Sequence, residues 1–123
     1  MRAEGIKDNY AFFRLSVDPS DKSEVVHLKA GNFFLSFAKE GELLRPIVDP
    51  RVIFGEVSDF SFPKCYLARN FRYPAKQLTQ GITPCAFVFN KARISPAKTL
   101  RVYSLFGHMR DINTLKQKIK TRH

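Results

Sequence analysis

The sequence lacks several features that would define its class at once. It has no tryptophan, and no stretch approaches the roughly eighteen apolar residues needed to cross a bilayer. The first ten residues, MRAEGIKDNY, contain no apolar run of the kind found in secretory signals. A soluble, cytoplasmic protein with no membrane contact is therefore expected.

Cysteine and histidine are also scarce. Nineteen residues separate Cys65 from Cys85, and the three histidines, His27, His108 and His123, are dispersed along the chain. A zinc site needs clustered thiolate and imidazole ligands, so neither a metal nor a cofactor is predicted. Packed free thiols are favoured over a disulfide, because a disulfide needs an oxidising compartment.

Acidic residues almost vanish from the second half of the chain. Residues 1–59 carry eight Lys and Arg against ten Asp and Glu, whereas residues 60–123 carry thirteen against Asp111 alone. The two halves therefore have net charges of −2 and +12, which sum to the total of +10. Such asymmetry is typical of a surface for nucleic acid or another anion, and equally of a domain whose acidic partner lies elsewhere.

Phenylalanine is abundant, with twelve residues beside four tyrosines. Rings in this number suit the half-buried surface of a sheet better than a helical bundle. The chain length of 123 residues, with 44% hydrophobic and 26% charged residues, is typical of one folded domain spanning residues 1–123.

Alternating apolar residues predict a series of short strands. The clearest hairpin joins 33–38 to 43–48 through the polar loop 39–42, and a second is expected between 85–93 and 99–106. The remaining segments with strand character or a short apolar run are 10–17, 24–30, 51–55 and 65–68. No helical crossovers separate these segments, so the fold class is mainly β, an antiparallel β-sandwich with one C-terminal α-helix.

The expected helix begins after Asp111. Ile112, Leu115 and Ile119 recur at intervals of three and four, and Asp111 suits the N-cap position. Its basic side chains would then face water while the apolar positions dock on the sheet.

The segment 69–81 has no periodicity and is the best candidate for a binding loop. Its cations Arg69, Arg72 and Lys76 alternate with the rings of Phe71 and Tyr73, a combination that can engage a phosphate and a stacked base or sugar. The alternative is that the two rings anchor the loop to the core while the cations face water.

No catalytic residue is assigned. His108 follows Gly107 at an expected strand-to-helix junction, where a ligand could bind, although capping or packing is the commoner role. Asp49, Glu56 and Asp59 form the only acidic cluster in loop-like sequence. Carboxylates about 5 to 9 Å apart could serve glycoside chemistry, but sequence spacing alone does not establish that distance, so a solvated loop is the favoured interpretation.

Two long stretches resemble a known family. GNFFLSFAKEGELLRPIVDPRVIFGEVSDFSFPKCYL and RYPAKQLTQGITPCAFVFNKARISPAKTLRVYSLFGHMRDI are similar to the large β-sandwich region of the β-1,2-oligoglucan phosphorylases, relatives of cellobiose phosphorylase in glycoside hydrolase family 94. The features that carry the resemblance are LLRPIVDPRVIFG, TPCAF and YSLFGHMRD, and the similarity extends over about residues 31–115.

The resemblance implies a supersandwich-type domain that accompanies a catalytic (α/α)-barrel in enzymes of carbohydrate metabolism. These enzymes cleave or build β-glucosidic bonds with inorganic phosphate, and their catalytic acid lies in the barrel. Since a chain of 123 residues has no room for such a barrel, no catalytic residue is transferred. The chain is then a fragment or module of a larger carbohydrate-active protein.

Two functions of different classes follow. The first is a non-catalytic β-sandwich module that binds an oligosaccharide or assembles with a separate (α/α)-barrel domain. The second is a small basic domain that binds nucleic acid through its positively charged second half. Salt separates them, since phosphate contacts weaken steeply as salt rises whereas sugar stacking barely responds. A small enzyme built on His108 and the carboxylates of residues 49–59 is a third interpretation.

Overall fold

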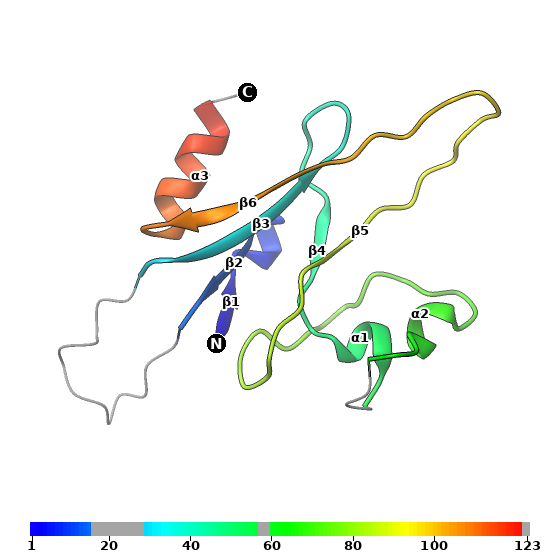
Figure 1. Cartoon of the computed structure of the whole chain (residues 1–123), viewed down its shortest axis with the longest axis horizontal. Coiled ribbons are helices and arrows are strands. Elements are labelled where there is room, and N and C mark those ends of the chain that lie inside the picture. Colours follow the sequence, from blue (N-terminus) through cyan, green and yellow to red (C-terminus); the bar gives the residue numbers. More distant parts are fainter. Residues whose placement is uncertain (16–28, 57–59, 122–123) are drawn as a thin grey trace.

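The computed structural model describes residues 1–15, 29–56 and 60–121. Its strands form antiparallel sheets, and one longer helix lies at the C-terminal end (Figure 1). In chain order the elements are β1 (Arg2–Glu4), the 3-10 helix η1 (Ile6–Asp8), β2 (Ala11–Arg14), β3 (Gly31–Phe37), β4 (Arg45–Ile47), α1 (Arg51–Phe54), α2 (Lys64–Leu67), β5 (Phe87–Phe89), β6 (Tyr103–Met109) and α3 (Ile112–Thr121).

Four strands form the main sheet, in the order β1-β2-β3-β6. Strands β3 and β6 pair along their whole lengths, from Gly31 opposite Met109 to Phe37 opposite Tyr103. Paired residues point to the same face, so alternation assigns Phe33, Leu35 and Phe37 to one face and the residues between them to the other.

Helix α3 covers the face that carries Phe33 and Leu35. Its buried residues Leu115 and Ile119 form a cluster with these side chains and with Phe12 of β2. The predicted N-cap is confirmed, because the backbone amide of Thr114 donates a hydrogen bond of 2.7 Å to Oδ1 of Asp111. The sequence prediction of one C-terminal helix docked by its apolar positions is therefore correct.

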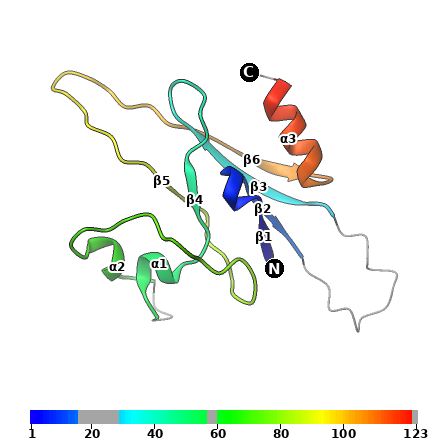
Figure 2. The same ribbon diagram turned by 180° about the vertical axis from the view of Figure 1, so that it is seen from behind.

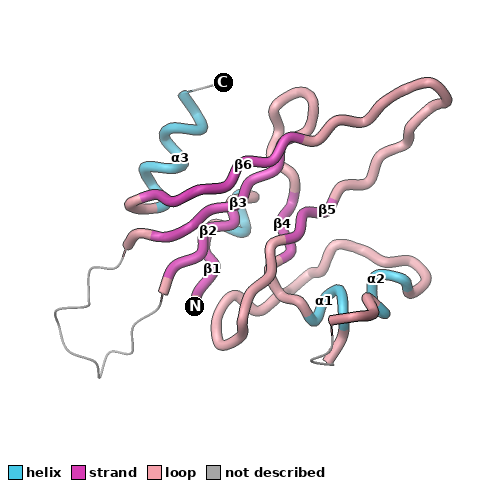
Figure 3. The backbone as a smooth tube through the Cα atoms, in the orientation of Figure 1, coloured by secondary structure: helices cyan, strands magenta, loops and turns pink. Residues whose placement is uncertain are grey.

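A second, two-stranded sheet consists of β4 and β5. Val48, directly after β4, is fully buried and packs with Ala3 and Ala11 on the face of the main sheet opposite to α3. The two sheets do not close into a complete sandwich, as the tube view shows (Figure 3). The mainly β prediction thus holds at the level of antiparallel sheets.

Of the two predicted hairpins, the first is confirmed only next to its loop and the second is wrong. In the first, Phe37 bridges Leu43 and the backbone amide of Leu44 donates to the carbonyl of Ser36, and β4 then diverges to pair with β5. In the second, β5 pairs with β4 and β6 pairs with β3. Strands β4, β5 and β6 therefore pair with partners other than those predicted, whereas β1, β2 and β3 pair with their neighbours in sequence.

Two other predicted segments are helical rather than extended. The apolar run of 51–55 forms α1, and the segment 65–68 coincides largely with α2. A proline precedes each helix, Pro50 and Pro63, and proline fixes a backbone angle that suits a helix start. The segment 10–17 is confirmed in part as β2, whereas most of 24–30 lies outside the described residues.

A long extended segment, residues 90–102, joins β5 to β6 and projects from the rest of the chain in both views (Figures 1 and 2). We call it the arm. Every residue of the arm is exposed. Among the described residues it makes one backbone hydrogen bond, from Lys98 to Ser95 at its tip.

Candidate functional site

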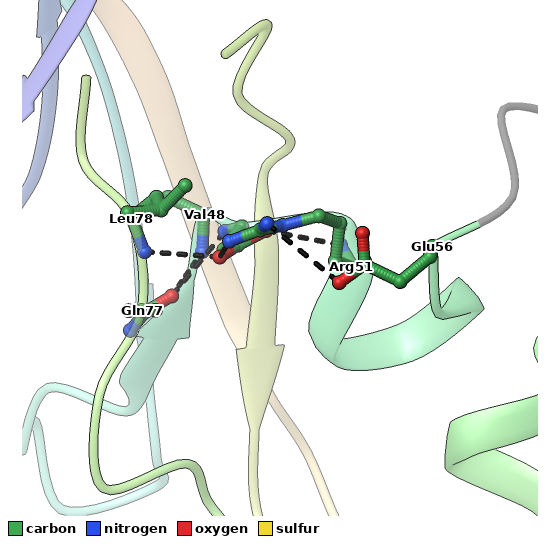
Figure 4. A network of polar contacts seen from close by, with 6 residues as sticks. Val48, Arg51, Glu56, Gln77 and Leu78 are labelled. Carbon is green, nitrogen blue, oxygen red and sulfur yellow. Dashed lines mark hydrogen bonds and ion pairs between the residues drawn. The ribbon is translucent and has the colours of Figure 1, made fainter. Parts of the chain in front are cut away.

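A buried carboxylate organises the loop region beside β4. Asp49 is only 3% exposed, and its two oxygens accept four hydrogen bonds. Three come from Arg51, through its backbone amide at 3.0 Å, Nε at 3.2 Å and Nη2 at 3.0 Å, and the fourth comes from the backbone amide of Leu78 at 2.9 Å (Figure 4). Asp49 therefore joins the start of α1 to a segment almost thirty residues further along the chain.

Gln77 makes a second connection between the same segments. Its Oε1 accepts hydrogen bonds from the backbone amides of Val48 at 2.8 Å and Asp49 at 3.3 Å (Figure 4). Its Nε2 donates to the carbonyl of Pro46 and to the hydroxyl of Tyr73, and that hydroxyl donates to the same carbonyl at 2.7 Å. We call the contacts of Asp49, Gln77 and Tyr73 the clamp, because they hold residues 73–78 against residues 46–51.

The residues of the clamp form one wall of a cavity of about 600 Å³ that opens to solvent. Residues of η1 and the following turn, β4, the start of α1 and the segment 73–79 surround it. The lining residues used below are Lys7, Arg45, Asp49, Arg51, Tyr73 and Lys76. A cavity of this size falls within the range of small-molecule sites, about 300–1,000 Å³.

Positive charge dominates the cavity. Burial alone would raise the pKa of Asp49, but the hydrogen bonds from Arg51 and Leu78 outweigh it, and the pKa of this carboxyl is lowered. Asp49 is thus ionised and compensated by Arg51. Three further cations line the cavity, Lys7, Arg45 and Lys76, and none of them forms an ion pair within the described part of the chain.

Arg45 is held in place by an aromatic ring. Its guanidinium carbon lies 4.2 Å from the centre of the Tyr73 ring, within the range of a cation–π contact. The contact covers one face of this ring, and the other rings nearby pack on β5, with Phe89 5.9 Å from Tyr73. Because Arg45 occupies one face of the Tyr73 ring, less of this ring is available for stacking against a sugar than the sequence predicted.

The structure brings together only part of the predicted binding set. Tyr73 and Lys76 line the cavity, whereas the exposed Arg69 and Arg72 are not among its lining residues. Tyr73 fits both interpretations of the loop. It lines the cavity, and its hydroxyl also anchors the segment through a hydrogen bond to the carbonyl of Pro46. Phe71 has the anchoring role alone, with its ring centre 5.3 Å from Tyr66 and 5.9 Å from Phe89.

His108 lies apart from this cavity. It belongs to β6 rather than to a strand-to-helix junction, and its Nδ1 lies 3.0 Å from Oδ1 of Asn32 on the neighbouring strand. This histidine therefore takes part in a cross-strand contact on the main sheet.

Sequence reasoning missed the contributions of Lys7, Arg45 and Arg51 to the cavity. Arg45 was read as one residue of a strand, and the cation of η1 lies far away in sequence. The sequence signal for the position of Arg51 was the pair Asp49-Pro50 directly before it. This pair is typical of a strand end, but it can also precede a helix whose first backbone amide donates a hydrogen bond to the carboxylate of Asp49.

Two members of the acidic cluster, Asp49 and Glu56, lie in the described part of the chain. Asp49 and Glu56 both face Arg51, at 3.0 and 3.8 Å, and the lowered pKa of Asp49 keeps it from serving as a proton donor near neutral pH. Asp59 lies outside the described residues. Within residues 1–15, 29–56 and 60–121, no three His, Cys, Asp or Glu side chains gather closely enough to hold a metal ion.

Both cysteines are free. Cys85 is partly buried beside β4, and its Sγ lies 3.5 Å from the carbonyl oxygen of Ile47. Burial raises the pKa of the Cys85 thiol to about 11. A thiol with this pKa is a poor nucleophile, so Cys85 has a packing role.

The second candidate site is an uncovered surface on the arm and β6. From residue 60 to residue 114 no residue is buried. We call the exposed apolar side chains of the arm and β6 the apolar strip, and its members are Ile94, Leu100, Val102, Tyr103, Leu105 and Phe106. Within β6, Tyr103 and Leu105 lie on the α3 face of the sheet, whereas Phe106 lies on the opposite face. Phe106 is 77% exposed in the middle of a strand, an unusual position for a phenylalanine ring.

The strand that carries part of this strip is the open edge of the main sheet. β6 pairs with β3 on one side only, and its seven residues contain no lysine, arginine or proline. Natural edge strands usually carry such residues to prevent pairing with other chains. An apolar cavity of about 270 Å³ also opens beside Tyr103 and Leu105, between β6 and the end of α3.

Comparison with family models, with curated proteins and with solved structures found no match. None of the helices within the described ranges has the length and apolar character needed to span a bilayer. The assignment of a function therefore depends on the two surfaces described above.

Proposed function

We propose that this chain is a non-catalytic β module that assembles with a separate (α/α)-barrel domain of a carbohydrate-active, glycoside phosphorylase-like protein. The observation that carries the proposal is the long stretch 60–114, in which no residue is buried. The resemblance of residues 31–115 to the β-sandwich region of β-1,2-oligoglucan phosphorylases supports the nature of the partner.

The arm gives the proposal its physical basis. Fixing the backbone of one residue costs about 1–2 kcal/mol, so holding the thirteen residues 90–102 in one path costs roughly 13–26 kcal/mol. One internal backbone hydrogen bond and no buried side chain offset little of this. A partner surface that covers the arm would supply the missing contacts.

The open sheets fit the same role. In the proposal, β6 and the arm lie within a larger supersandwich-like β-sandwich that the neighbouring domain covers or completes. Of the two roles expected for such a module, assembly is favoured over glycan binding. Arg45 already covers one face of the Tyr73 ring, whereas the apolar strip is free.

The test uses the full chain and a separately produced (α/α)-barrel domain of a β-1,2-oligoglucan phosphorylase. Size-exclusion chromatography with light scattering should show a 1:1 complex. Phe106→Thr should weaken it at least tenfold, because a well-packed aromatic anchor contributes about 2 kcal/mol or more. Threonine retains strand propensity and the ring is exposed, so the fold should survive.

Leu15→Thr is the matched control. Leu15 is 58% exposed and follows β2 at the end of the main sheet opposite to the arm. This variant should bind as the unchanged chain does. Failure of the unchanged chain to bind the barrel at tens of micromolar, or equal losses in both variants, would refute assembly through this surface. A homodimer of the unchanged chain that dissociates on the substitution Phe106→Thr would also refute it, since the apolar strip would then bind a second copy of this chain.

The arm also carries the observation that favours a second candidate. Its cations are Lys91, Arg93, Lys98 and Arg101, and it contains no acidic residue. Together with the exposed ring of Tyr103 they form a surface that could follow a nucleic-acid backbone. Binding of a single-stranded oligonucleotide that falls more than tenfold between about 50 and 200 mM salt would support this candidate.

A further inference from the structure

We infer that the cavity beside the clamp is a binding site for a small phosphate monoester, such as a phosphorylated sugar. The inference concerns the cavity between η1, β4 and residues 73–79, and it is independent of the arm. It goes beyond the assembly role, because it assigns this module a small-molecule ligand of its own.

Charge identifies the ligand as an anion. Lys7, Arg45 and Lys76 line the cavity without an acidic partner among the described residues, and Asp49 is compensated by Arg51 at 3.0 Å. A phosphate monoester carries about −1.5 to −2 charges at neutral pH. Its charge therefore matches the three cations better than the single charge of a carboxylate does.

The clamp keeps the cavity in shape before a ligand arrives. Gln77 and Asp49 use their side-chain oxygens to hold the backbone amides of Val48, Arg51 and Leu78. The wall formed by residues 73–78 is therefore fixed by hydrogen bonds to residues 46–51. A preformed cavity loses less conformational entropy on binding than a loop that must first become ordered.

Arg45 provides the recognition element. Its guanidinium carbon lies 4.2 Å from the centre of the Tyr73 ring, and among the described residues its N–H donors have no acceptor. A guanidinium held in this way can donate two parallel hydrogen bonds to phosphate oxygens. The remainder of the cavity, with a volume of about 600 Å³, has room for a sugar-sized group.

The experiment follows backbone amide shifts of the full chain by NMR while glucose 6-phosphate is added at constant ionic strength. Saturable shifts are expected at Asn9, Gln77 and Leu78, which lie at the cavity, with affinity at least tenfold higher than for glucose. Arg45→Gln and Lys76→Gln should each weaken binding at least fivefold. The same spectra show whether each variant is folded.

Arg101→Gln is the matched control, because it removes a cation from the exposed arm. It should leave the affinity unchanged. Shifts that increase linearly without saturation, equal binding of glucose, or equal losses in Arg101→Gln and Arg45→Gln would overturn the inference. Equal affinity for sodium sulfate in place of the sugar phosphate would overturn it as well, because the cavity would then bind inorganic dianions without contacting a sugar.

Discussion

The substitution Asp49→Asn tests the clamp with the smallest possible change of shape. The carboxylate accepts hydrogen bonds on both oxygens, from the backbone amide and side chain of Arg51 and from the backbone amide of Leu78. Asparagine offers one acceptor oxygen and places an NH₂ donor on the other side. Whichever way the amide turns, one of the two backbone amides loses its acceptor.

The magnitude follows from these contacts. A hydrogen bond to a charged group contributes about 1.5–3 kcal/mol, and the loss of one backbone contact falls in this range. The side chain of Arg51 is 40% exposed, so its guanidinium can bind water once the carboxylate is removed. The lost ion pair therefore adds little to the change in the free energy of unfolding. We expect Asp49→Asn to lower the free energy of unfolding by about 2 kcal/mol, which shifts a urea midpoint by roughly 1 M.

Urea unfolding followed by far-ultraviolet circular dichroism measures the effect. Glu56→Gln is the control, because Glu56 lies 3.8 Å from the same Arg51 but is 89% exposed. Its midpoint should equal that of the unchanged chain. A midpoint for Asp49→Asn that coincides with the control would refute the reasoning that the clamp stabilises this region.

The effect also depends on pH in a defined direction. The folded-state pKa of Asp49 is lowered below the unfolded value of about 3.9, so its stabilising contribution is complete above that pH. The contribution is lost as pH falls through the lower folded-state pKa. The stability difference between the unchanged chain and Asp49→Asn should therefore shrink below about pH 4. A difference that grows on acidification would show that the carboxylate is protonated in the folded state.

Two further predictions concern the cap of α3 and the reactivity of Cys85. Asp111→Ala should lower the thermal midpoint and the helical dichroism signal, because the amide of Thr114 loses its acceptor, whereas Asp111→Asn should preserve both. Equal midpoints for the alanine and asparagine variants would contradict the cap. With a pKa of about 11, the Cys85 thiol should be only about 0.1% ionised at pH 8. Peptide mass spectrometry after iodoacetamide treatment should therefore find Cys85 largely unmodified in folded protein and fully alkylated in urea, and rapid alkylation without urea would contradict the burial.

The sequence predicted the elements that have sustained patterns. The alternation of residues 33–38 and the helical spacing of Ile112, Leu115 and Ile119 persist for several residues, and both reappear in β3 and α3. The one-turn helices α1 and α2 contain four residues each, too few to distinguish a helical period from an alternating one. Pro50 and Pro63 precede these helices, but proline also occurs at strand ends, so its position alone does not distinguish the two structures.

The pairing of the strands was not predicted correctly, for a different reason. The sequence prediction paired neighbours, since short connections are the commonest. Here β3 pairs with β6 although Phe37 and Tyr103 are sixty-six positions apart. Local alternation defines which residues share a face but carries no information about a partner so distant.

The sequence predicted a binding loop over residues 69–81 rather than a cavity. Tyr73 and Lys76 belong to a segment whose composition stands out, whereas Arg45 lies on a short strand and Lys7 on a single 3-10 turn. Cations on such elements are usually solvated and therefore carry no distinguishing signal. Only the tertiary contacts of the clamp place them around one cavity.

Burial and charge divide the chain at nearly the same place. Among the residues that the structure describes, the buried ones lie before residue 54 or in α3, while the stretch 60–114 has none and carries most of the excess positive charge. A nucleic acid would neutralise the charge but leave Ile94 and Leu100 largely in water, because phosphates offer them no apolar contact. A protein surface with acidic residues around an apolar centre would satisfy both requirements. For this reason the apolar strip, rather than the charge, favours a protein as the partner of the arm, and binding that persists at high salt is the corresponding expectation.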